Sequence, residues 1–541
     1  MNRATHVPFA ALLTAVSLAA QTHLVADLNP GSAGSEITAI TVLGDAAIFA
    51  AFDGTSVNLY SSDGSTAGTT IITVLDAVSP FGSPAQLVTV GSRVLFAWND
   101  GTTGLELWAT DGTAAGTALV KDIRAGLFGS LPTSLTEIDG VCYFSAAETG
   151  ANFELWRSDG TTAGTWLVKE IHSSTSAGSI PGAFAKLGST GKFLFAATDA
   201  TAGRELWVSD GTAAGTSLVK DIVPGPGGAS SSNPLFLTSF GEQVAFATLS
   251  QLWISDGTAA GTTAVTSTTM APRQLAAQNG KLFFQGFDGA HGYELWTSDG
   301  TAAGTAMLAD LYVGGVPAWG SFPFVLTPVG SRWVFFSATN AFGEELWRTD
   351  GASITELFHD VSVGSASSSP GANGYPGSHL VNSRFAVTPG GKMFFAAHDG
   401  TNGRELHVFD TGVVASSPTF GASCGGLSLA ATKPYLGTTV VLTTSGIPAT
   451  TLGSLNVLSL TKYVPPIDLT PAGITGCWLH TGVESVTGMS GHPTATTTFT
   501  IPNNVLLLGF EVYSQSGSLV PEANEFGLIT SNAVTLSIGD L

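Results

Sequence analysis

Short apolar runs separated by Gly, Asp, Thr and Ser recur through most of the chain, and they predict β-strands. Near residue 290, the apolar segments 274–277 and 281–284 flank a turn at Asn279 and Gly280, and strands over 293–297 and from Thr305 follow. Apolar residues stand on both faces of these strands, which is typical of sheets packed between other sheets. The pattern predicts an all-β region built from four-stranded sheets.

One segment makes the repetition explicit. Glu106–Thr117 recurs closely from Glu154, Glu205 and Glu294, and weaker copies start at Asn58, Gln251, Glu345 and Glu405. The copies share an aspartate and lie 43 to 60 residues apart: Asp63, Asp111, Asp159, Asp210, Asp256, Asp299, Asp350 and Asp410. This period is that of four-stranded propeller blades. The sequence therefore predicts an eight-bladed β-propeller over residues 21–413, with seven blades as the alternative if the first or last copy is not a sheet.

The last copy has no fourth strand after Glu405–Gly412, because Ser and Pro follow. The missing piece is at the other end of the chain, where Leu24–Gly31 matches Leu218–Gly225, the fourth strand of the fourth copy. Closing the ring would pair strand edges that otherwise invite aggregation. We therefore expect residues 24–28 to pair with residues 405–409.

The conspicuous Asp-Gly-Thr-x-x-Gly-Thr run lies between the third and fourth strands of each copy. Glycine permits positive φ, and Asp and Thr side chains bond turn amides, so a structural turn is the favoured interpretation. Eight calcium loops are the alternative, but each turn brings one carboxylate and calcium takes six to eight oxygens. The motif Trp residues are expected to pack one blade against the next.

The repeats resemble the ELWxxDGT repeat family of secreted bacterial proteins over residues 22–413. The best matches are Glu106–Thr117, Glu154–Thr165, Glu205–Thr216 and Glu294–Thr305. The resemblance implies export and a propeller-like array, and it brings no catalytic residues. Some copies depart from the pattern, with Tyr60 and His407 in place of Trp and Asn58 and Gln251 in place of Glu. These departures argue against a catalytic task for the motif Glu.

The N-terminus predicts export. Arg3, the apolar stretch Pro8–Leu18 and the small residues Ser17–Ala20 match a signal peptide over residues 1–20, with a buried strand as the alternative. No later apolar run reaches the length of a transmembrane helix. The net charge of −21 disfavours nucleic acid as a partner. The mature chain is expected to be a monomer outside the cytoplasm, either released or held at the cell surface.

The composition changes after the repeats. Residues 414–423 are expected to be a linker, and residues 424–541 a β-sandwich, because alternating stretches such as 438–443 and 505–513 are separated by Pro and Gly turns. Cys424 and Cys477 could pair in an oxidising compartment, while Cys142 is expected to be a small buried hydrophobe. The segments around Cys424, Ile467–Thr470, Cys477, Asn524–Leu528 and Ser531-Asn532 resemble a C-terminal domain of exported planctomycete proteins. This resemblance implies an accessory, sorting or attachment module.

Candidate chemistry is sparse. The ten histidines show no metal-ligand spacing, no nucleophile elbow or nucleotide-binding loop occurs, and no cofactor or metal is expected. Acidic residues recur in the loops between the second and third strands: Asp53, Asp100, Glu148, Asp199, Asp288 and Asp399. They predict either a solvated rim of Asx-type turns or a cation- or sugar-binding face.

The connectors that enter each blade vary most, and variable loops on a rigid frame commonly bind ligands. Trp319, Phe322, Tyr375 and His379 lie in connectors and could stack on sugars, anchor a protein, or pack the loops. The sequence favours a non-catalytic exported scaffold that presents a binding face to a glycan or surface protein. The alternatives are an extracellular glycan-active hydrolase or lyase and a purely structural surface protein. Three or more titratable groups in the central channel would favour an enzyme.

Overall fold

The computed structural model describes the following residues: 22–76, 84, 86–172, 177–225, 230–266, 269–313, 320–330, 332–341, 343–352, 354–362, 367–371, 385–410, 419–420, 427–431, 439–459, 462–469, 478–481, 485–489, 494–500, 511–520 and 528–537. Two compact units are present, Thr22–Phe409 and a second that contains Asp410–Leu541. The residues described form strands and no helix, which confirms the all-β prediction. Within this described part, no helix is long and apolar enough to cross a membrane.

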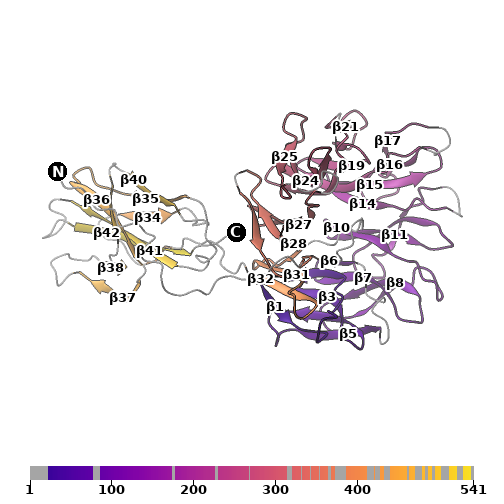
Figure 1. Ribbon diagram of the computed structural model, residues 1–541, viewed down its shortest axis with the longest axis horizontal. Helices are drawn as coiled ribbons and strands as arrows, with labels where there is room; N and C mark the ends of the chain where they lie inside the picture. The colour runs from indigo at the N-terminus through magenta and orange to yellow at the C-terminus, as the bar shows by residue number, and fades with distance from the viewer. Residues whose placement is uncertain are drawn as a thin grey trace. The chain divides into compact units, whose positions relative to one another are not determined.

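The unit Thr22–Phe409 consists, in the residues described, of eight four-stranded antiparallel sheets (Figure 1). The first four are β2 (Ala39–Leu43), β3 (Ala46–Phe52), β4 (Val57–Ser62) and β5 (Thr70–Asp76); β6 (Leu87–Val90), β7 (Arg93–Asn99), β8 (Leu105–Thr110) and β9 (Ala118–Lys121); β10 (Thr133–Ile138), β11 (Val141–Ala147), β12 (Phe153–Ser158) and β13 (Trp166–Lys169); and β14 (Gly182–Leu187), β15 (Lys192–Asp199), β16 (Gly203–Ser209) and β17 (Ser217–Lys220).

The other four sheets follow in the same order along the chain, except that the last takes in the first strand. They are β18 (Leu235–Phe240), β19 (Gln243–Ala247), β20 (Leu252–Ser255) and β21 (Thr263–Ala264); β22 (Arg273–Gln278), β23 (Lys281–Asp288), β24 (Gly292–Ser298) and β25 (Ala306–Ala309); β26 (Phe324–Val329), β27 (Trp333–Asn340), β28 (Gly343–Thr349) and β29 (Thr355–His359); and β30 (Ala386–Val387), β31 (Lys392–His398) and β32 (Arg404–Asp410), completed by β1 (His23–Ala26).

The innermost strands follow one another around a ring. Contacts join β2 to β6, β6 to β10, β10 to β14, β14 to β18, β18 to β22, β22 to β26, and β30 to β2. The remaining step, from β26 to β30, is bridged by Phe385, whose amide donates to Thr327 Oγ1 at 3.1 Å. We interpret each sheet as one propeller blade, formed by one sequence repeat.

The N-terminal strand completes the last sheet. β1 pairs antiparallel with β32, with Leu24 opposite His407 and Ala26 opposite Leu406. Val25 is 1% exposed and packs in a cluster with Phe49 of β3 and Val408 of β32. The sequence predicts this pairing, and it joins the two ends of the unit.

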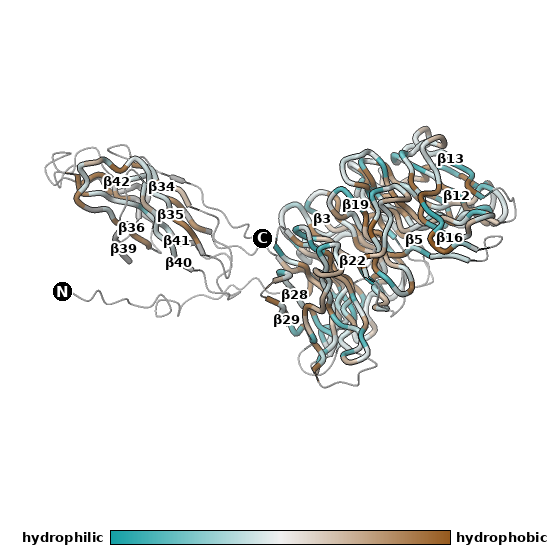
Figure 2. Tube along the Cα trace, turned by 90° about the horizontal axis from the view of Figure 1, so that it is seen from above, coloured by the Kyte–Doolittle hydropathy of each residue, from teal (hydrophilic) through white to brown (hydrophobic). Residues whose placement is uncertain are grey.

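Apolar clusters fill the space between neighbouring sheets, and hydrophobic residues run along the strands (Figure 2). Trp156 of β12 packs with Leu95 and Leu107 of the preceding sheet. The expected blade-to-blade role of the motif Trp is therefore confirmed. Where the motif departs from Trp, another ring occupies the position: His407 stacks on Phe395 at 5.9 Å between ring centroids.

The motif turn explains why Asp, Thr and Gly recur together. Asp111 Oδ1 accepts hydrogen bonds from the amide and hydroxyl of Thr113 at 2.9 and 2.7 Å, and Thr113 Oγ1 accepts one from the Gly116 amide at 3.0 Å. A Cβ at position 116 would collide with the Asp111 carboxylate. The aspartate therefore serves its own turn, as the structural interpretation predicts. Equivalent bonds form at Asp63, Asp159, Asp210, Asp256 and Asp299.

The second unit is a β-sandwich-like arrangement of three sheets in the residues described. The sheets are β33 (Thr419–Phe420), β42 (Leu528–Ser537), β41 (Glu511–Leu519), β36 (Gly453–Ser459) and β39 (Ser485–Met489); β34 (Ser428–Ala431), β35 (Thr439–Ser445) and β40 (Thr494–Thr500); and β37 (Lys462–Asp468) and β38 (Trp478–Thr481). Asn532 of β42 bonds the amide of Leu429 at 2.9 Å, and Thr444 Oγ1 lies 2.6 Å from Ser516 Oγ. These bonds tie the two larger sheets together.

Several sequence predictions concern residues that the structure does not describe. The signal peptide at 1–20 and the pair Cys424 and Cys477 lie outside the described residues and stay predictions. The segment expected to be a linker, 414–423, contains β33, which pairs with Ala533 and Val534 of β42. Cys142 is buried with a free thiol.

Candidate functional site

The motif glutamates hold the connectors between blades. Glu106 is fully buried and accepts hydrogen bonds from the amides of Ile123, Arg124 and Ser130 at 3.1, 2.9 and 2.8 Å. The Ser130 hydroxyl donates at 2.5 Å to Glu106 Oε2, the oxygen that also accepts the Ile123 amide. One carboxylate therefore binds both ends of the connector that leads to the next blade. A buried carboxylate is tolerated because these charge-assisted donors replace water.

The same arrangement recurs in four other sheets, in the part of each connector that the structure describes. The carboxylate bonds a serine of the following connector in the pairs Glu154–Ser179, Glu205–Ser232, Glu294–Ser321 and Glu345–Ser368. In the last sheet, Glu405 accepts from the amides of Leu28 and Asn29 at 3.2 and 3.4 Å. The residue after each serine has a positive φ, as in Ile180 at 46° and Phe322 at 47°. The motif Glu is thus structural, which agrees with its absence from two copies.

Three of these carboxyls, those of Glu294, Glu345 and Glu405, have pKa values raised by burial. Burial raises the pKa of Glu345 to about 7, and the hydrogen bonds from Ser368 and Val361 only partly offset this effect. Burial likewise raises the pKa of Glu405 to about 7. The native state therefore holds protons on these groups at pH values where an unfolded chain has released them.

This shift predicts a pH-dependent effect of Glu345→Gln. The pKa of Glu345 is higher in the folded than in the unfolded chain, so its contribution to the free energy of unfolding falls as pH rises from about 4.5 to about 7. Glutamine does not titrate, so Glu345→Gln does not show this fall. The melting temperature of Glu345→Gln relative to the unsubstituted protein should therefore rise between about pH 5 and pH 8, by the equivalent of at most about 3 kcal/mol. Glu148→Gln, which removes an exposed acid, is the control for the loss of one carboxyl group. A constant or falling difference for Glu345→Gln would refute the shift.

The five loop aspartates form Asx-type turns, whereas the sixth loop acid, Glu148, is exposed. Asp53 Oδ1 accepts hydrogen bonds from the amides of Thr55 and Ser56, both at 2.8 Å. Partial burial acts to raise the pKa of Asp53, but hydrogen bonds from Thr55, Ser56 and Asn58 outweigh burial and lower this pKa to about 2. Comparable amide bonds occur at Asp100, Asp199, Asp288 and Asp399. Their carboxylates are engaged locally, which favours the solvated rim over a shared cation site. In the described residues, no group of three or more His, Cys, Asp or Glu could hold a metal.

Of the four predicted binding residues, Phe322 is described, and Trp319, Tyr375 and His379 lie outside the described residues. Phe322 stacks on Tyr293 at 5.2 Å and on Phe324 at 6.4 Å between ring centroids. The exposed Arg273 guanidinium lies 5.0 Å over the Tyr293 ring. The three rings are half-buried. We call Arg273, Tyr293, Phe322 and Phe324 the aromatic shelf, and it lies where connectors enter β22 and β26.

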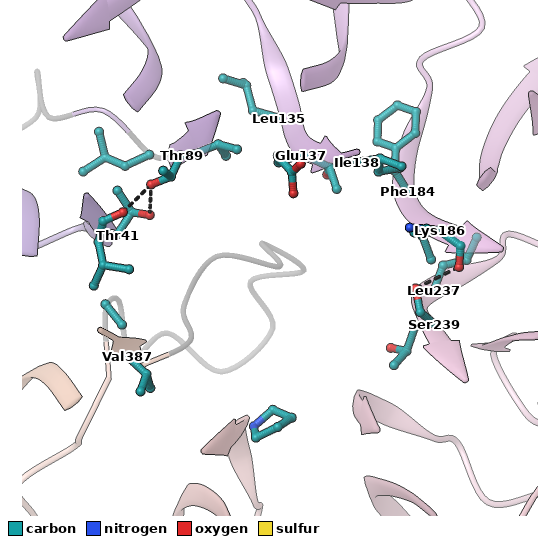
Figure 3. A pocket seen from close by; sticks show the side chains of 18 of the residues that line it. Thr41, Thr89, Leu135, Glu137, Ile138, Phe184, Lys186, Leu237, Ser239 and Val387 are labelled. Atoms are coloured by element: carbon teal, nitrogen blue, oxygen red, sulfur yellow. Dashed lines mark hydrogen bonds between the residues drawn. The ribbon is translucent and has the colours of Figure 1, made fainter. Parts of the chain in front are cut away.

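A cavity of 790 Å³ lies among the innermost strands, and residues from all eight first strands line it (Figure 3). Among the described residues that line it are three titratable side chains, Glu137, Asp139 and Lys186, and three such groups is the number at which the sequence favours an enzyme. However, Lys186 Nζ lies 2.6 Å from Asp139 Oδ1, and Glu137 Oε1 accepts the Gly140 amide at 2.6 Å. Lys186 therefore pairs with Asp139, and Glu137 is a single further acid. These groups do not form a general acid and a general base placed on either side of a substrate.

Sequence reasoning missed most of these residues. A Ser-x-Pro signal in the connectors, as in Ser130–Pro132 and Ser321–Pro323, marks the serine partner of Glu106, Glu154, Glu205, Glu294 and Glu345 and was available from the sequence. Of the stacking partners of Phe322, Phe324 lies two residues further along the chain, whereas Tyr293 belongs to β24, so no local signal identifies Tyr293. Glu137 and Lys186 occupy a position at which the repeats differ.

No protein family matches the chain, and no curated protein matches it. Among solved structures, the β-propeller domain of the trilobed protease from Pyrococcus furiosus is 11% identical, with 60% of this chain and 99% of that chain covered and a TM-score of 0.34. BamB from Moraxella catarrhalis is 13% identical, covering 73% and 99% with a TM-score of 0.37. A puromycin hydrolase is 13% identical, covering 71% and 61% with a TM-score of 0.37, so this chain spans less than two thirds of that enzyme. These likenesses carry no argument about function.

Proposed function

We propose that this protein is an exported, non-catalytic β-propeller that binds glycans on the face where the connectors enter the blades. The aromatic shelf is the observation that carries the proposal. Half-buried rings stacked at 5.2 and 6.4 Å offer flat apolar surface, and the exposed Arg273 beside them can donate to sugar hydroxyls or carboxylates. The resemblance of the repeats to the ELWxxDGT family supports export.

The engagement of the repeated acids supports a non-catalytic role. Glu205 is bonded to the connector through Ile222 and Ser232, and Asp210 bonds the amide and hydroxyl of Thr212 in its own turn. Groups held in this way are not free to protonate a leaving group or to activate water. An extracellular hydrolase or lyase is the second candidate, and the three titratable side chains of the cavity are the observation in its favour.

A glycan array and a glycan substrate panel, both applied to the full mature chain, test the proposal. We expect binding of a glycan class without turnover, and a loss of about tenfold or more in affinity for Phe322→Ala and Tyr293→Ala. Trp166→Ala is the matched control, because Trp166 is 42% exposed and also stacks with an arginine, Arg157, at 4.4 Å, but stands in the outer strand β13. Turnover of any glycan would refute the non-catalytic role. Equal losses in all three variants, or binding to protein ligands alone, would refute the shelf as a glycan site.

A further inference from the structure

The first strands place one residue each at the same level of the channel. Seven of these residues form the second pair from their hairpin turn, as Glu137 does with Cys142 and Lys186 with Phe193, and the eighth, Val387, forms the first pair, with Met393. We call these residues the inner ring: Val42, Thr89, Glu137, Lys186, Ser239, Ala277, Pro328 and Val387. All of them line the cavity and none is buried, whereas residues two places earlier, such as Leu135 and Phe184, are. The inner ring therefore contributes accessible surface to the cavity from every first strand.

The inner ring is divided into two halves of different chemistry. Four consecutive blades contribute polar side chains: Thr89, Glu137, Lys186 and Ser239. The other four contribute apolar ones: Ala277, Pro328, Val387 and Val42. Figure 3 shows Thr89, Glu137, Lys186 and Ser239 along one side of the cavity and Val387 on the other. A ligand filling this space would meet hydrogen-bonding groups on one side and apolar surface on the other.

The charges of the polar half do not cancel. Lys186 and Asp139 neutralise each other at 2.6 Å, and both side chains are about half exposed, at 42% and 52%. Among the described residues, the Glu137 carboxylate accepts one hydrogen bond, from the Gly140 amide to Oε1 at 2.6 Å. One uncompensated negative charge therefore faces the cavity from β10. The net charge of −21 also attracts cations toward the protein.

We propose that the inner ring binds a small organic cation: an ammonium group on Glu137 with a compact apolar body against Ala277, Pro328 and Val387. Ammonium–carboxylate hydrogen bonds provide orientation, and burial of the apolar body provides affinity. The cavity volume of 790 Å³ lies within the range of small-molecule sites. This site is separate from the aromatic shelf and does not rest on the proposed glycan function.

Calorimetric titration of the full mature chain with 2-phenylethylamine, and with 2-phenylethanol as its uncharged counterpart, tests this proposal. We expect the amine to bind at least about tenfold more tightly than the alcohol, and Glu137→Gln to remove that preference. Glu242→Gln is the matched control: it removes the same charge, but Glu242 bonds Ser189 at 3.0 Å and does not line the cavity. It should leave the affinity for the amine unchanged.

Three outcomes would overturn the proposal. The first is that neither compound binds, and the second is that the amine and the alcohol bind equally tightly. The third is that Glu137→Gln and Glu242→Gln change the affinity for the amine equally. Phe322→Ala should leave amine binding unchanged, whereas Glu137→Gln should leave glycan binding unchanged. Failure of the amine site and failure of the glycan shelf are therefore distinguishable.

Discussion

We expect Glu205→Ala to destabilise the propeller by about 3–5 kcal/mol. Glu205 is fully buried, and its carboxylate accepts the amides of Ile222 and Ser232 at 3.0 and 2.7 Å and the Ser232 hydroxyl at 2.5 Å. Alanine leaves these three donors without acceptors, and a buried unpaired donor costs about 1–3 kcal/mol. Urea unfolding followed by fluorescence measures the change.

The control for Glu205→Ala is Glu148→Ala, which removes an exposed acid from a loop between a second and a third strand. Its effect should stay within about 0.5 kcal/mol. Hydrogen exchange should also localise the effect of Glu205→Ala, because the amides of Ile222 and Ser232 lose their acceptors. Equal stability of the two variants would show that the motif Glu does not hold the connector.

We expect Val25→Asp to open the ring. Val25 is 1% exposed between Phe49 and Val408, so an aspartate there must either bury an unpaired charge, at a cost of more than about 4 kcal/mol, or pull β1 out of the last sheet. Loss of β1 exposes the edge of β32 and takes the Leu28 and Asn29 amides from Glu405. A large fall in melting temperature and aggregation on size exclusion should result.

Val25→Ile is the control for ring opening, because it keeps the position apolar. It should cost less than about 1.5 kcal/mol and leave the elution of the protein on size exclusion unchanged. If Val25→Asp melted and eluted like Val25→Ile, β1 would not be part of the core of the last sheet.

Local signals made much of the fold predictable. The turn at Asp111 contains all its partners within a few residues, so its sequence reveals its structure. The closing strand was also predictable, because Leu24–Gly31 keeps the pattern of a fourth strand although it lies far from the last repeat. β33 was not predictable, because its strand conformation depends on pairing with β42 more than a hundred residues later.

The candidate sites could be predicted only in part. Phe322 was found as an aromatic residue in a variable connector, but its stacking partner Tyr293 belongs to the previous repeat's third strand. Glu137 and Lys186 gave no signal, because equivalent positions elsewhere carry residues as different as Val and Pro. Such positions look unconstrained when the repeats are compared. Their side chains share one cavity only because the ring of sheets closes.

Disulfide trapping of the last sheet tests the central claim, that the two ends of the repeat array meet in one closed propeller. Leu24 and His407 are opposite one another in β1 and β32. The double variant Leu24→Cys, His407→Cys should form an intramolecular disulfide in the folded protein, detected by peptide mapping, and adding Val25→Asp should abolish it. Leu24→Cys with Trp347→Cys, at the equivalent motif position of the preceding blade, should not cross-link. Absence of the first disulfide in folded protein, or equal cross-linking of both pairs, would contradict the closed ring.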